Sequence, residues 1–470
     1  MMKSEKNSIF GKMMILEGMV LLVPLLVLPF YQKEISLAWM FILPAFISIL
    51  SGALLCKIKK ERGRINSNRI VVGAWLYGFL LAAIPFYLYG NVNPVQALFE
   101  AVSGYTTTGL SVLDVSVTPQ VFLFYRSFLQ FVGGLGFVMM MLIFVQGKHS
   151  VNLFEAEGHP DRLMPNIGKT AKVIFKMYSF FLVCGTVAYV IAGMSVFDSL
   201  LHTMCALSTG GFSNRLASIG YYESLPIEFI TVILMLIGTT NFSLLLLLFR
   251  GKWKEFIRSS EMRFLAGIVV LFVPVMTFFL TQSGNSFAES LRQSFFNAFS
   301  ALSTTGYATS GYTDWPQLAV VLLTILMLVG GGIGSTAGGI KLGRVCIVAK
   351  NLWKNVKRKV LPKRSVILCH YNRGTEQEIL SEERIEEAST YTQVYLLIFI
   401  LGSILLSYFA GCSFLYGAFE FASSLGTVGL SIGVTSMETP DICLLIEIVG
   451  MIMGRLEIFV LFKIFTKRIS

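Results

Sequence analysis

The chain has 470 residues, of which 54% are hydrophobic and only 14% are charged. Because soluble globular proteins carry about 25% charged residues, this composition excludes a cytosolic enzyme, a secreted disulfide-linked domain and a disordered chain. The charged residues cluster between apolar stretches of about twenty residues, the length that crosses the hydrocarbon core of a bilayer. The composition therefore predicts an all-α polytopic membrane protein.

Ten apolar spans follow one another along the chain, and the first lacks a cleavage-site pattern, so we expect it to be retained as a helix. The predicted limits are 13–30, 36–56, 70–90, 119–146, 171–193, 226–249, 264–281, 317–347, 391–411 and 440–463. Basic residues gather in alternate loops, with six in 57–69, five in 250–263 and eight in 350–373. Since Lys and Arg accumulate in cytoplasmic loops, topology explains the net charge of +11, and both termini are predicted to be cytoplasmic.

Two classes of chemical site are disfavoured by the motifs. The seven cysteines are scattered and form neither a CxxC pair nor a Cys/His cluster, which argues against a disulfide framework or a zinc site. Gly332-x-Gly334-x-x-Ala337 follows a membrane-length span instead of a short strand, and Gly168-Lys169-Thr170 lacks the earlier glycine of a phosphate-binding loop. We therefore predict no enzymatic activity and no organic cofactor.

A fourfold internal repeat is the strongest signal in the sequence. Each copy has a large apolar residue ten positions before a glycine, a small residue six positions before it and a threonine two positions before it. The glycines are Gly109, Gly211, Gly306 and Gly429, and the threonines are Thr107, Thr209, Thr304 and Thr427. A single run of small residues is often a helix-packing contact, but four runs in register predict a repeated structural unit.

Each copy follows an amphipathic stretch of about ten residues that lies between two apolar spans. A helix of that length extends about 15 Å, half of the hydrocarbon thickness, so the chain must enter the membrane and return on the same side. Non-helical backbone at that depth must be buried in protein or line a water-filled path. The sequence thus predicts four pseudo-symmetric helix–pore loop–helix repeats around a central pore, preceded by two extra N-terminal transmembrane helices.

The residues of these loops suit a desolvated monovalent cation. Glycine accepts a positive φ, so successive carbonyl groups can point to one axis and replace the water shell of an ion. The C-terminal ends of the short helices add negative dipole ends, and the absence of carboxylates in the turns argues against a divalent cation. The predicted filter residues are Thr106, Thr107, Thr108, Gly109, Ser208, Thr209, Gly210, Gly211, Ser303, Thr304, Thr305, Gly306, Gly426, Thr427, Val428 and Gly429.

On these motifs the chain resembles the Trk/Ktr/HKT superfamily of potassium transporters over about residues 10–465. The resemblance implies K⁺ uptake across the bacterial cytoplasmic (inner) membrane, with K⁺ as the transported ion. Glycine at all four filter positions is the pattern that the superfamily associates with K⁺ selectivity, whereas members with serine in the first loop tend to pass Na⁺. The implied units are an N-terminal helix pair with a basic loop (1–69) and repeats at 70–170, 171–263, 264–390 and 391–470.

The stretch 330–341 contains six glycines within ten residues, each of which costs about 1 kcal/mol inside a helix. The span 317–347 is therefore predicted to break in the middle of the membrane. The resemblance implies a movable gate loop beneath the filter, and a glycine-rich packing contact is the alternative. The predicted gate residues are Gly330, Gly331, Gly332, Gly334, Ser335, Thr336, Gly338, Gly339 and Arg455.

Arg455 lies inside the last predicted span, where an arginine is costly unless it faces water or a partner. The resemblance implies an electrostatic barrier in the conduction path, and an ion pair, for example with Glu457, is the alternative. One column of the short helices is polar in every repeat, and we expect it to anchor these helices more than to bind ions. Its members are Glu100, His202, Asn297 and Glu420.

The resemblance also implies a homodimer and a cytosolic, TrkA-like nucleotide-binding regulatory subunit. Segments 146–172 and 350–390 are candidate docking sites, with ordinary solvated loops as the alternative. Asp114, above the first turn, either concentrates cations or is a solvated loop charge. K⁺/H⁺ or K⁺/Na⁺ symport on the same fold is the alternative function, although no filter column holds a carboxylate.

Overall fold

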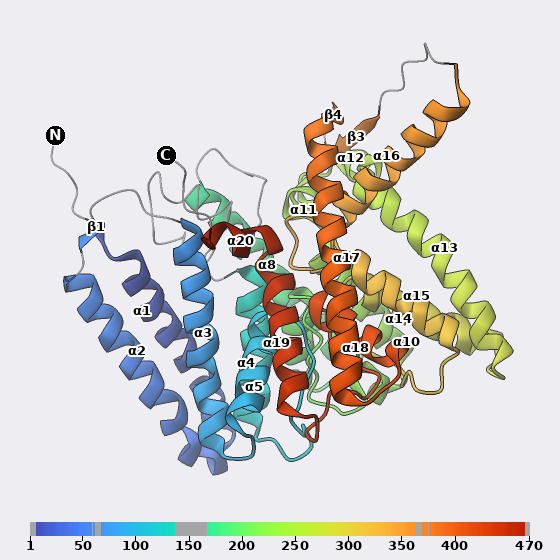
Figure 1. Cartoon of the computed structure of the whole chain (residues 1–470). Coiled ribbons are helices and arrows are strands. Elements are labelled where there is room, and N and C mark those ends of the chain that lie inside the picture. Colours follow the sequence, from blue (N-terminus) through green and yellow to red (C-terminus); the bar gives the residue numbers. More distant parts are fainter. Residues whose placement is uncertain are drawn as a thin grey trace, which may run out of the picture.

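The computed structural model describes residues 6–58, 60–61, 67–136, 167–362, 369–374 and 376–465. Within these residues the chain is helical except for two short antiparallel strand pairs and the connecting turns. Figure 1 shows long helices that run roughly in one direction, with shorter helices between them. The predicted all-helical architecture is therefore what the described part of the chain adopts.

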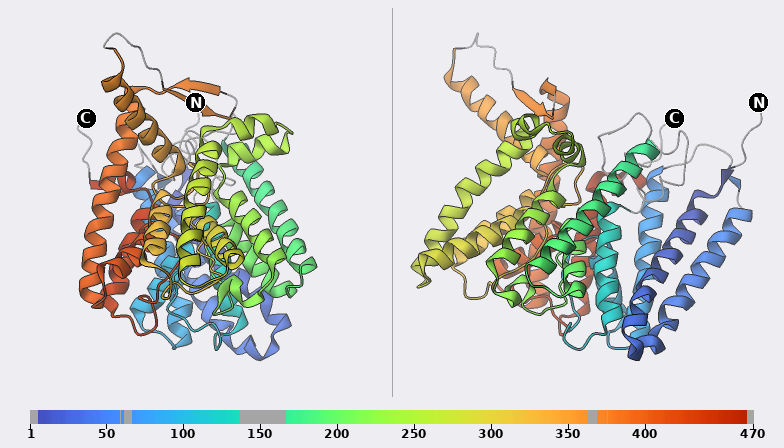
Figure 2. Two further views of the ribbon diagram at one scale, coloured as in Figure 1. Left: turned by 90° about the vertical axis from the view of Figure 1, so that its right-hand side faces the viewer. Right: turned by 180° about the vertical axis from the view of Figure 1, so that it is seen from behind.

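The N-terminal unit is a pair of closely packed helices at one edge of the molecule (Figures 1 and 2). Its elements are β1 (Lys6–Asn7), α1 (Ile9–Leu22), the 3₁₀ helices η1 (Val23–Phe30) and η2 (Gln32–Leu37), α2 (Trp39–Ile58) and β2 (Lys60–Glu61). A methyl group added to Gly18 would overlap the carbonyl oxygen of Ala45, so glycine permits the close approach of the two helices. β1 pairs with β2 at the end of the unit.

The first helix of each repeat is long and continuous. These helices are α3 (Ser67–Tyr89), α8 (Ile167–Ile191), α13 (Ser260–Gln282) and α17 (Glu382–Ala410). Their outer faces expose large apolar side chains, such as Leu397 and Leu401 on α17, which are 60% and 54% exposed. Apolar outer faces of this kind suit contact with lipid, because lipid tails are as apolar as leucine.

A short helix follows each long one, and these four helices form the buried centre of the molecule. They are α4 (Pro94–Tyr105), α9 (Val196–Leu207), α14 (Phe287–Leu302) and α18 (Phe414–Leu425). Each begins at a side chain that accepts a hydrogen bond from the backbone N–H three residues later, which satisfies an otherwise unpaired donor. The four capping residues are Asn93, Ser195, Ser286 and Ser413.

The second helix of each repeat stops after 13 to 16 residues. These helices are α5 (Gln120–Leu135), α10 (Leu225–Thr239), α15 (Gln317–Val329) and α19 (Asp441–Arg455). After the break the chain continues as α11 (Phe242–Phe249), α16 (Leu342–Val360) and α20 (Ile458–Phe465) in repeats two, three and four. In repeat one, the predicted span 119–146 extends beyond residue 136, outside the described residues.

The break in 317–347 was predicted, whereas the helices within the spans 226–249 and 440–463 are also interrupted, which the sequence analysis did not predict. Helices α10 and α11 meet at 114°, because the chain leaves the helix at Thr240 and Asn241 caps the next one. In the last span, Glu457 has a φ of 58°, which ends α19. Within the described residues, six helices are long and apolar enough to cross a membrane, or seven if α10 and α11 count as one span.

The remaining elements lie at the two ends of the bundle. They are η3 (Ser218–Tyr222), α12 (Trp253–Arg258) and the hairpin strands β3 (His370–Arg373) and β4 (Glu376–Ile379). Figure 1 places α11, α12 and the β3–β4 hairpin at the same end as β1, whereas the loop between α4 and α5 lies at the opposite end. The predicted cytosolic segments and the predicted outer loops therefore lie at opposite ends.

Candidate functional site

The four predicted filter turns share one backbone conformation. Their threonines have φ of 57°, 53°, 55° and 49°, and their glycines have φ of 95°, 73°, 81° and 95°. A β-branched residue with positive φ is a rare and strained conformation that persists only where the surroundings impose it. Each turn therefore holds a conformation that its own sequence disfavours at the threonine.

The structure brings the four turns together in a closed ring. In each turn the glycine Cα lies against a carbonyl oxygen of the next repeat, and an added methyl group would overlap that oxygen. The pairs are Gly109 with Gly210, Gly211 with Thr305, Gly306 with Val428, and Gly429 with Thr108. Glycine is thus required at these positions both by its positive φ and by the approach of the neighbouring turn.

A cavity of about 450 Å³ opens on one side of this ring. All four glycines line it, together with serines two residues beyond three of them, Ser111, Ser213 and Ser431. Arg126 and Arg215 also line this cavity, but each forms an ion pair with a carboxylate, at 3.2 Å from Glu100 and 2.8 Å from Asp198 respectively. The turns are therefore reached through one shared, polar cavity.

The polar column, which was predicted to anchor the short helices, bonds each of them to the chain that leaves the turn. In every repeat the column residue contacts a hydroxyl group eleven or twelve residues later, beyond the turn. The contacts are Glu100 with Ser111 (2.6 Å), His202 with Ser213 (2.9 Å), Asn297 with Thr309 (3.1 Å) and Glu420 with Ser431 (2.6 Å). The two glutamates also accept backbone N–H groups, from Val112 and Ile432.

Gln130 is a supporting residue that the sequence analysis did not single out. Its amide donates to the carbonyl oxygen of Gly210 at 2.5 Å and accepts from the N–H of Phe212 at 3.1 Å. This side chain from repeat one therefore fixes the turn of repeat two. Gln130 lies three residues before Gly133, and the residues at the same distance before Gly238 and Gly454 are Met235 and Met451. An alignment of the repeats would therefore have shown Gln130 as a polar residue at an otherwise apolar position.

The predicted gate stretch is a buried loop between α15 and α16 that packs against the turns. The N–H of Gly338 donates to the Thr304 hydroxyl at 2.8 Å, and the Thr209 hydroxyl donates to that of Thr336 at 3.2 Å. The Thr336 hydroxyl also lies 2.9 Å from the carbonyl oxygen of Gly238 at the break of α10. The structure thus brings the predicted gate residues against the turns of repeats two and three.

Charged groups surround the far side of this loop. Lys341, which the sequence analysis did not select, has a φ of 84° and donates through Nζ to the carbonyl oxygen of Ala337. Arg344 forms an ion pair with Glu457 at 2.8 Å, so the suggested partner of Arg455 is engaged by another arginine. Arg455 itself donates to the carbonyl oxygen of Gly133 at 2.6 Å and lies 5.2 Å from the Trp75 ring.

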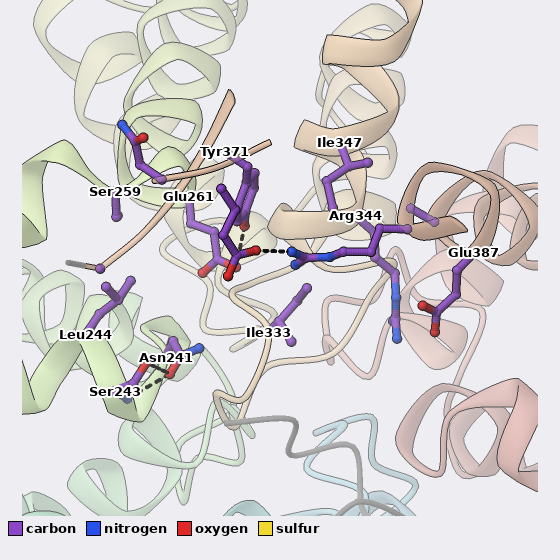
Figure 3. Close-up of a pocket in the computed structure, with 15 residues that line it drawn as sticks. Asn241, Ser243, Leu244, Ser259, Glu261, Ile333, Arg344, Ile347, Tyr371 and Glu387 are labelled. Carbon is purple, nitrogen blue, oxygen red and sulfur yellow. Dashed lines mark hydrogen bonds and ion pairs between the residues drawn. The ribbon is translucent and has the colours of Figure 1, made fainter. Parts of the chain in front are cut away.

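A second cavity, of about 380 Å³, lies between the loop and the β3–β4 hairpin (Figure 3). Figure 3 shows Ile333 of the loop near Glu261 of α13, with Tyr371 of the hairpin pointing toward Glu261. The Tyr371 hydroxyl donates to the Glu261 carboxylate at 3.2 Å, and burial raises the pKa of Tyr371. The hairpin and the loop therefore share one buried carboxylate.

Asp114 lies in the exposed loop after the first turn. The hydroxyl and backbone N–H of Ser116 donate to its carboxylate at 2.6 and 2.9 Å, and these hydrogen bonds lower the pKa of Asp114. The carboxylate is therefore charged at neutral pH.

Comparison with known proteins places this arrangement in a family. The family model described as "TrkH: Cation transport protein" matches residues 45–469. The chain belongs to the TrkH family of cation transport proteins. Among its relatives are the Trk system potassium uptake proteins TrkG and TrkH of Escherichia coli (strain K12), each 31% identical over 97% of this chain; the match covers 96% and 97% of the two relatives, respectively.

A solved structure agrees with this assignment. The crystal structure of the potassium transporter TrkH from Vibrio parahaemolyticus matches with a TM-score of 0.85 and 28% sequence identity, over 97% of each chain. The chain is therefore a multi-span helical membrane protein with the TrkH fold and is a transporter, not an enzyme.

Proposed function

We propose that this chain takes up K⁺ across the bacterial cytoplasmic membrane through a filter formed by the four turns. In this proposal the four repeats surround one central pore. The observation that supports this most strongly is the closed ring of Gly109, Gly211, Gly306 and Gly429 against carbonyl oxygens of neighbouring repeats. A ring of backbone carbonyl groups can replace the water shell of a monovalent cation. The membrane potential contributes about 2.3 kcal/mol per charge per 100 mV, which drives inward accumulation without ATP hydrolysis in this chain.

The test is growth of a bacterium that lacks its own K⁺ uptake, in low K⁺ with Na⁺ varied. Wild-type chain restores growth, and Gly109→Ser or Gly429→Ser raises Na⁺ permeation, because the new side chain displaces the neighbouring carbonyl group. An unchanged ratio of K⁺ to Na⁺ uptake in both variants would contradict the filter. If the reversal potential followed external pH or Na⁺, K⁺/H⁺ or K⁺/Na⁺ symport would replace simple conduction.

We further propose that the 330–341 loop gates this path and that Arg455 is an electrostatic barrier beside it. The hydrogen bonds of Thr336 and Gly338 to the turns and to the break of α10 hold the loop under the filter. Shortening the loop between Gly330 and Gly339 removes these contacts, so basal K⁺ flux in the absence of any activator rises. Unchanged basal flux would reject the gate, while leaving the filter proposal standing.

Control by a cytosolic, TrkA-like nucleotide-binding subunit and assembly as a homodimer are also proposed. Of the two candidate docking segments, most of 146–172 lies outside the described residues, whereas 350–390 includes the β3–β4 hairpin, which reaches the gate loop through Tyr371 and Glu261. Co-purification of the chain with such a subunit, with and without ATP, tests the partnership. Chemical crosslinking in native membranes tests the dimer.

The proposed orientation puts both termini and the hairpin in the cytoplasm. The cysteines provide a direct test, because Cys412 follows α17 at the proposed outer end and Cys369 precedes the hairpin at the proposed inner end. In intact cells, single-cysteine variants should differ in reaction with a membrane-impermeant maleimide, with Cys412 labelled and Cys369 protected. Labelling of Cys369 with protection of Cys412 would show that the orientation in the membrane is the opposite of the one proposed.

A further inference from the structure

A buried glutamate in the N-terminal helix pair is bonded directly to the first pore helix. Glu17 lies in α1, outside the four repeats, and its side chain is buried, with only 2% exposed. The hydroxyl of Tyr105 donates to Glu17 Oε2 at 2.5 Å. Tyr105 is the last residue of α4 and is followed at once by the filter residues Thr106–Gly109, so the bond ends one residue before the turn.

The other three repeats have no such bond at this position. The residue that ends the short helix before the turn is Leu207, Leu302 or Leu425, each of which is fully buried and offers no hydroxyl group. Packing of an apolar side chain does not fix direction in the way a hydrogen bond does. The short helix before the first turn therefore ends at a side-chain hydrogen bond, which the leucines at the same position do not supply to the other three turns.

The surroundings hold both partners in place. A methyl group on Gly78 of α3 would come within 2.5 Å of Glu17 Oε1, so α3 closes one side of the carboxyl group. The rings of Trp75 and Phe79 each lie 6.3 Å from the Tyr105 ring, measured between centroids. The backbone of Tyr105 is confined as well, because Gly133 of α5 packs against its carbonyl oxygen.

Burial of the Glu17 carboxyl group within a membrane span costs free energy, which indicates that the carboxyl group has a specific role. An ionisable side chain within a membrane span is disfavoured unless it has partners, and a leucine would fill the site at lower cost. The N-terminal pair also makes a partly buried polar contact with α3 that does not reach a pore helix, in which Tyr77 donates to Ser48 at 2.9 Å. Attachment of the pair to the repeats thus does not require Glu17.

We propose that Glu17 is a positioning residue for the filter: it orients Tyr105, and through it the turn Thr106–Gly109, so that the N-terminal helix pair helps to set the preference for K⁺ over Na⁺. This inference rests on the proposed filter function. It gives the two additional N-terminal helices a role in ion selection besides packing.

The test compares Glu17→Met, Glu17→Gln and Tyr105→Phe by K⁺ and Na⁺ uptake, normalised to the amount of protein in the membrane. Loss of one hydrogen bond corresponds to a roughly two- to tenfold change in an equilibrium, so the ratio of K⁺ to Na⁺ uptake should fall by about that factor in Glu17→Met and in Tyr105→Phe. Glu17→Gln keeps an acceptor oxygen and should retain most of the ratio. The double variant Glu17→Met with Tyr105→Phe should be no worse than either single variant.

Two controls separate the possible failures. Tyr77→Phe removes a different hydrogen bond between the N-terminal pair and α3 and should leave the ratio unchanged, whereas Gly429→Ser should lower it. If Gly429→Ser lowers the ratio while Glu17→Met and Tyr105→Phe leave it at the wild-type value, the role of Glu17 is rejected and the filter stands. If neither Gly109→Ser nor Gly429→Ser changes the ratio, the filter itself is rejected. Should Glu17→Met fail to reach the membrane, Tyr105→Phe tests the same bond from its other side.

Discussion

The first and second helices of each repeat differ although both were predicted to be full membrane spans. The first helices, α3, α8, α13 and α17, are continuous over 23 to 29 residues, with apolar outer faces. The second helices all end after 13 to 16 residues, close to the turns. The long first helices therefore form the outer surface of the molecule, whereas the second helices end where they contact the turns.

In three repeats, a glycine near the end of the second helix lets that helix pack against the end of the short helix. Methyl groups on Gly133, Gly238 and Gly454 would overlap or crowd the last carbonyl oxygen of the short helix in the same repeat, that of Tyr105, Leu207 and Leu425 respectively. In repeat three the α15–α16 loop contacts the turn instead: the N–H of Gly338 donates to the Thr304 hydroxyl, and Gly338 also packs against Gly426 of repeat four. The ends of the second helices thus pack against the residues that lead into the turns.

The largest expected effect comes from adding a methyl group where a second helix packs against a short helix. Gly454→Ala should reduce K⁺ uptake roughly tenfold or more, because the methyl group displaces the end of α18 and with it the fourth turn. The matched control is Gly267→Ala on the continuous helix α13, where the added methyl group meets nothing within 4 Å. Equal losses in uptake from the two variants would remove the distinction between the helices.

A smaller effect is expected from the hydroxyl groups of repeat three. Thr336→Val removes the contacts of the loop with Gly238 and Thr209, so basal flux should rise a few-fold, as expected for loss of about one to two hydrogen bonds. Thr324→Val on α15 removes a hydroxyl that bonds only to its own helix, at 2.9 Å from the Val320 carbonyl oxygen, and should leave basal flux unchanged. An equal rise in both variants would assign the effect to helix packing.

The ion pair at the break of the fourth repeat should contribute to stability more than to transport. Glu457→Gln leaves the half-buried Arg344 without its carboxylate and should lower the unfolding temperature of the purified protein by a few degrees. Lys252→Gln, which disrupts a more exposed pair with Glu255, should have no measurable effect. Thermal unfolding monitored by intrinsic fluorescence makes the comparison, and equal shifts would contradict it.

The smallest effect is expected on the outer face of a first helix. Leu401→Ala on α17 removes a side chain that is 54% exposed and should change neither uptake nor selectivity measurably. A loss as large as that of Gly454→Ala would mean that this face contacts protein instead of lipid.

Much of the site was predictable because the signal is local and repeated. The Thr-x-Gly spacing, the short amphipathic stretches and the six glycines of 330–341 each reflect backbone conformation within a few residues. The anchoring of Glu100 and Glu420 followed from their shared column. By contrast, the breaks at Thr240 and Glu457 were missed, because α10 with α11 and α19 with α20 are each largely apolar and long enough together to be drawn as one span.

The sequence by itself determined that the chain is a helical membrane protein with four equivalent turns, because hydrophobicity and glycine spacing act over short distances along the chain. Only the tertiary structure decided which carbonyl oxygen each glycine faces, where the second helices end, and that Glu17 of the first helix bonds to Tyr105. The residues that these contacts join are far apart in the chain, from 28 positions for Gly133 with Tyr105 to 321 positions for Gly429 with Thr108. The physical reason is that close packing between helices selects the partner of each group, and no local pattern encodes that choice.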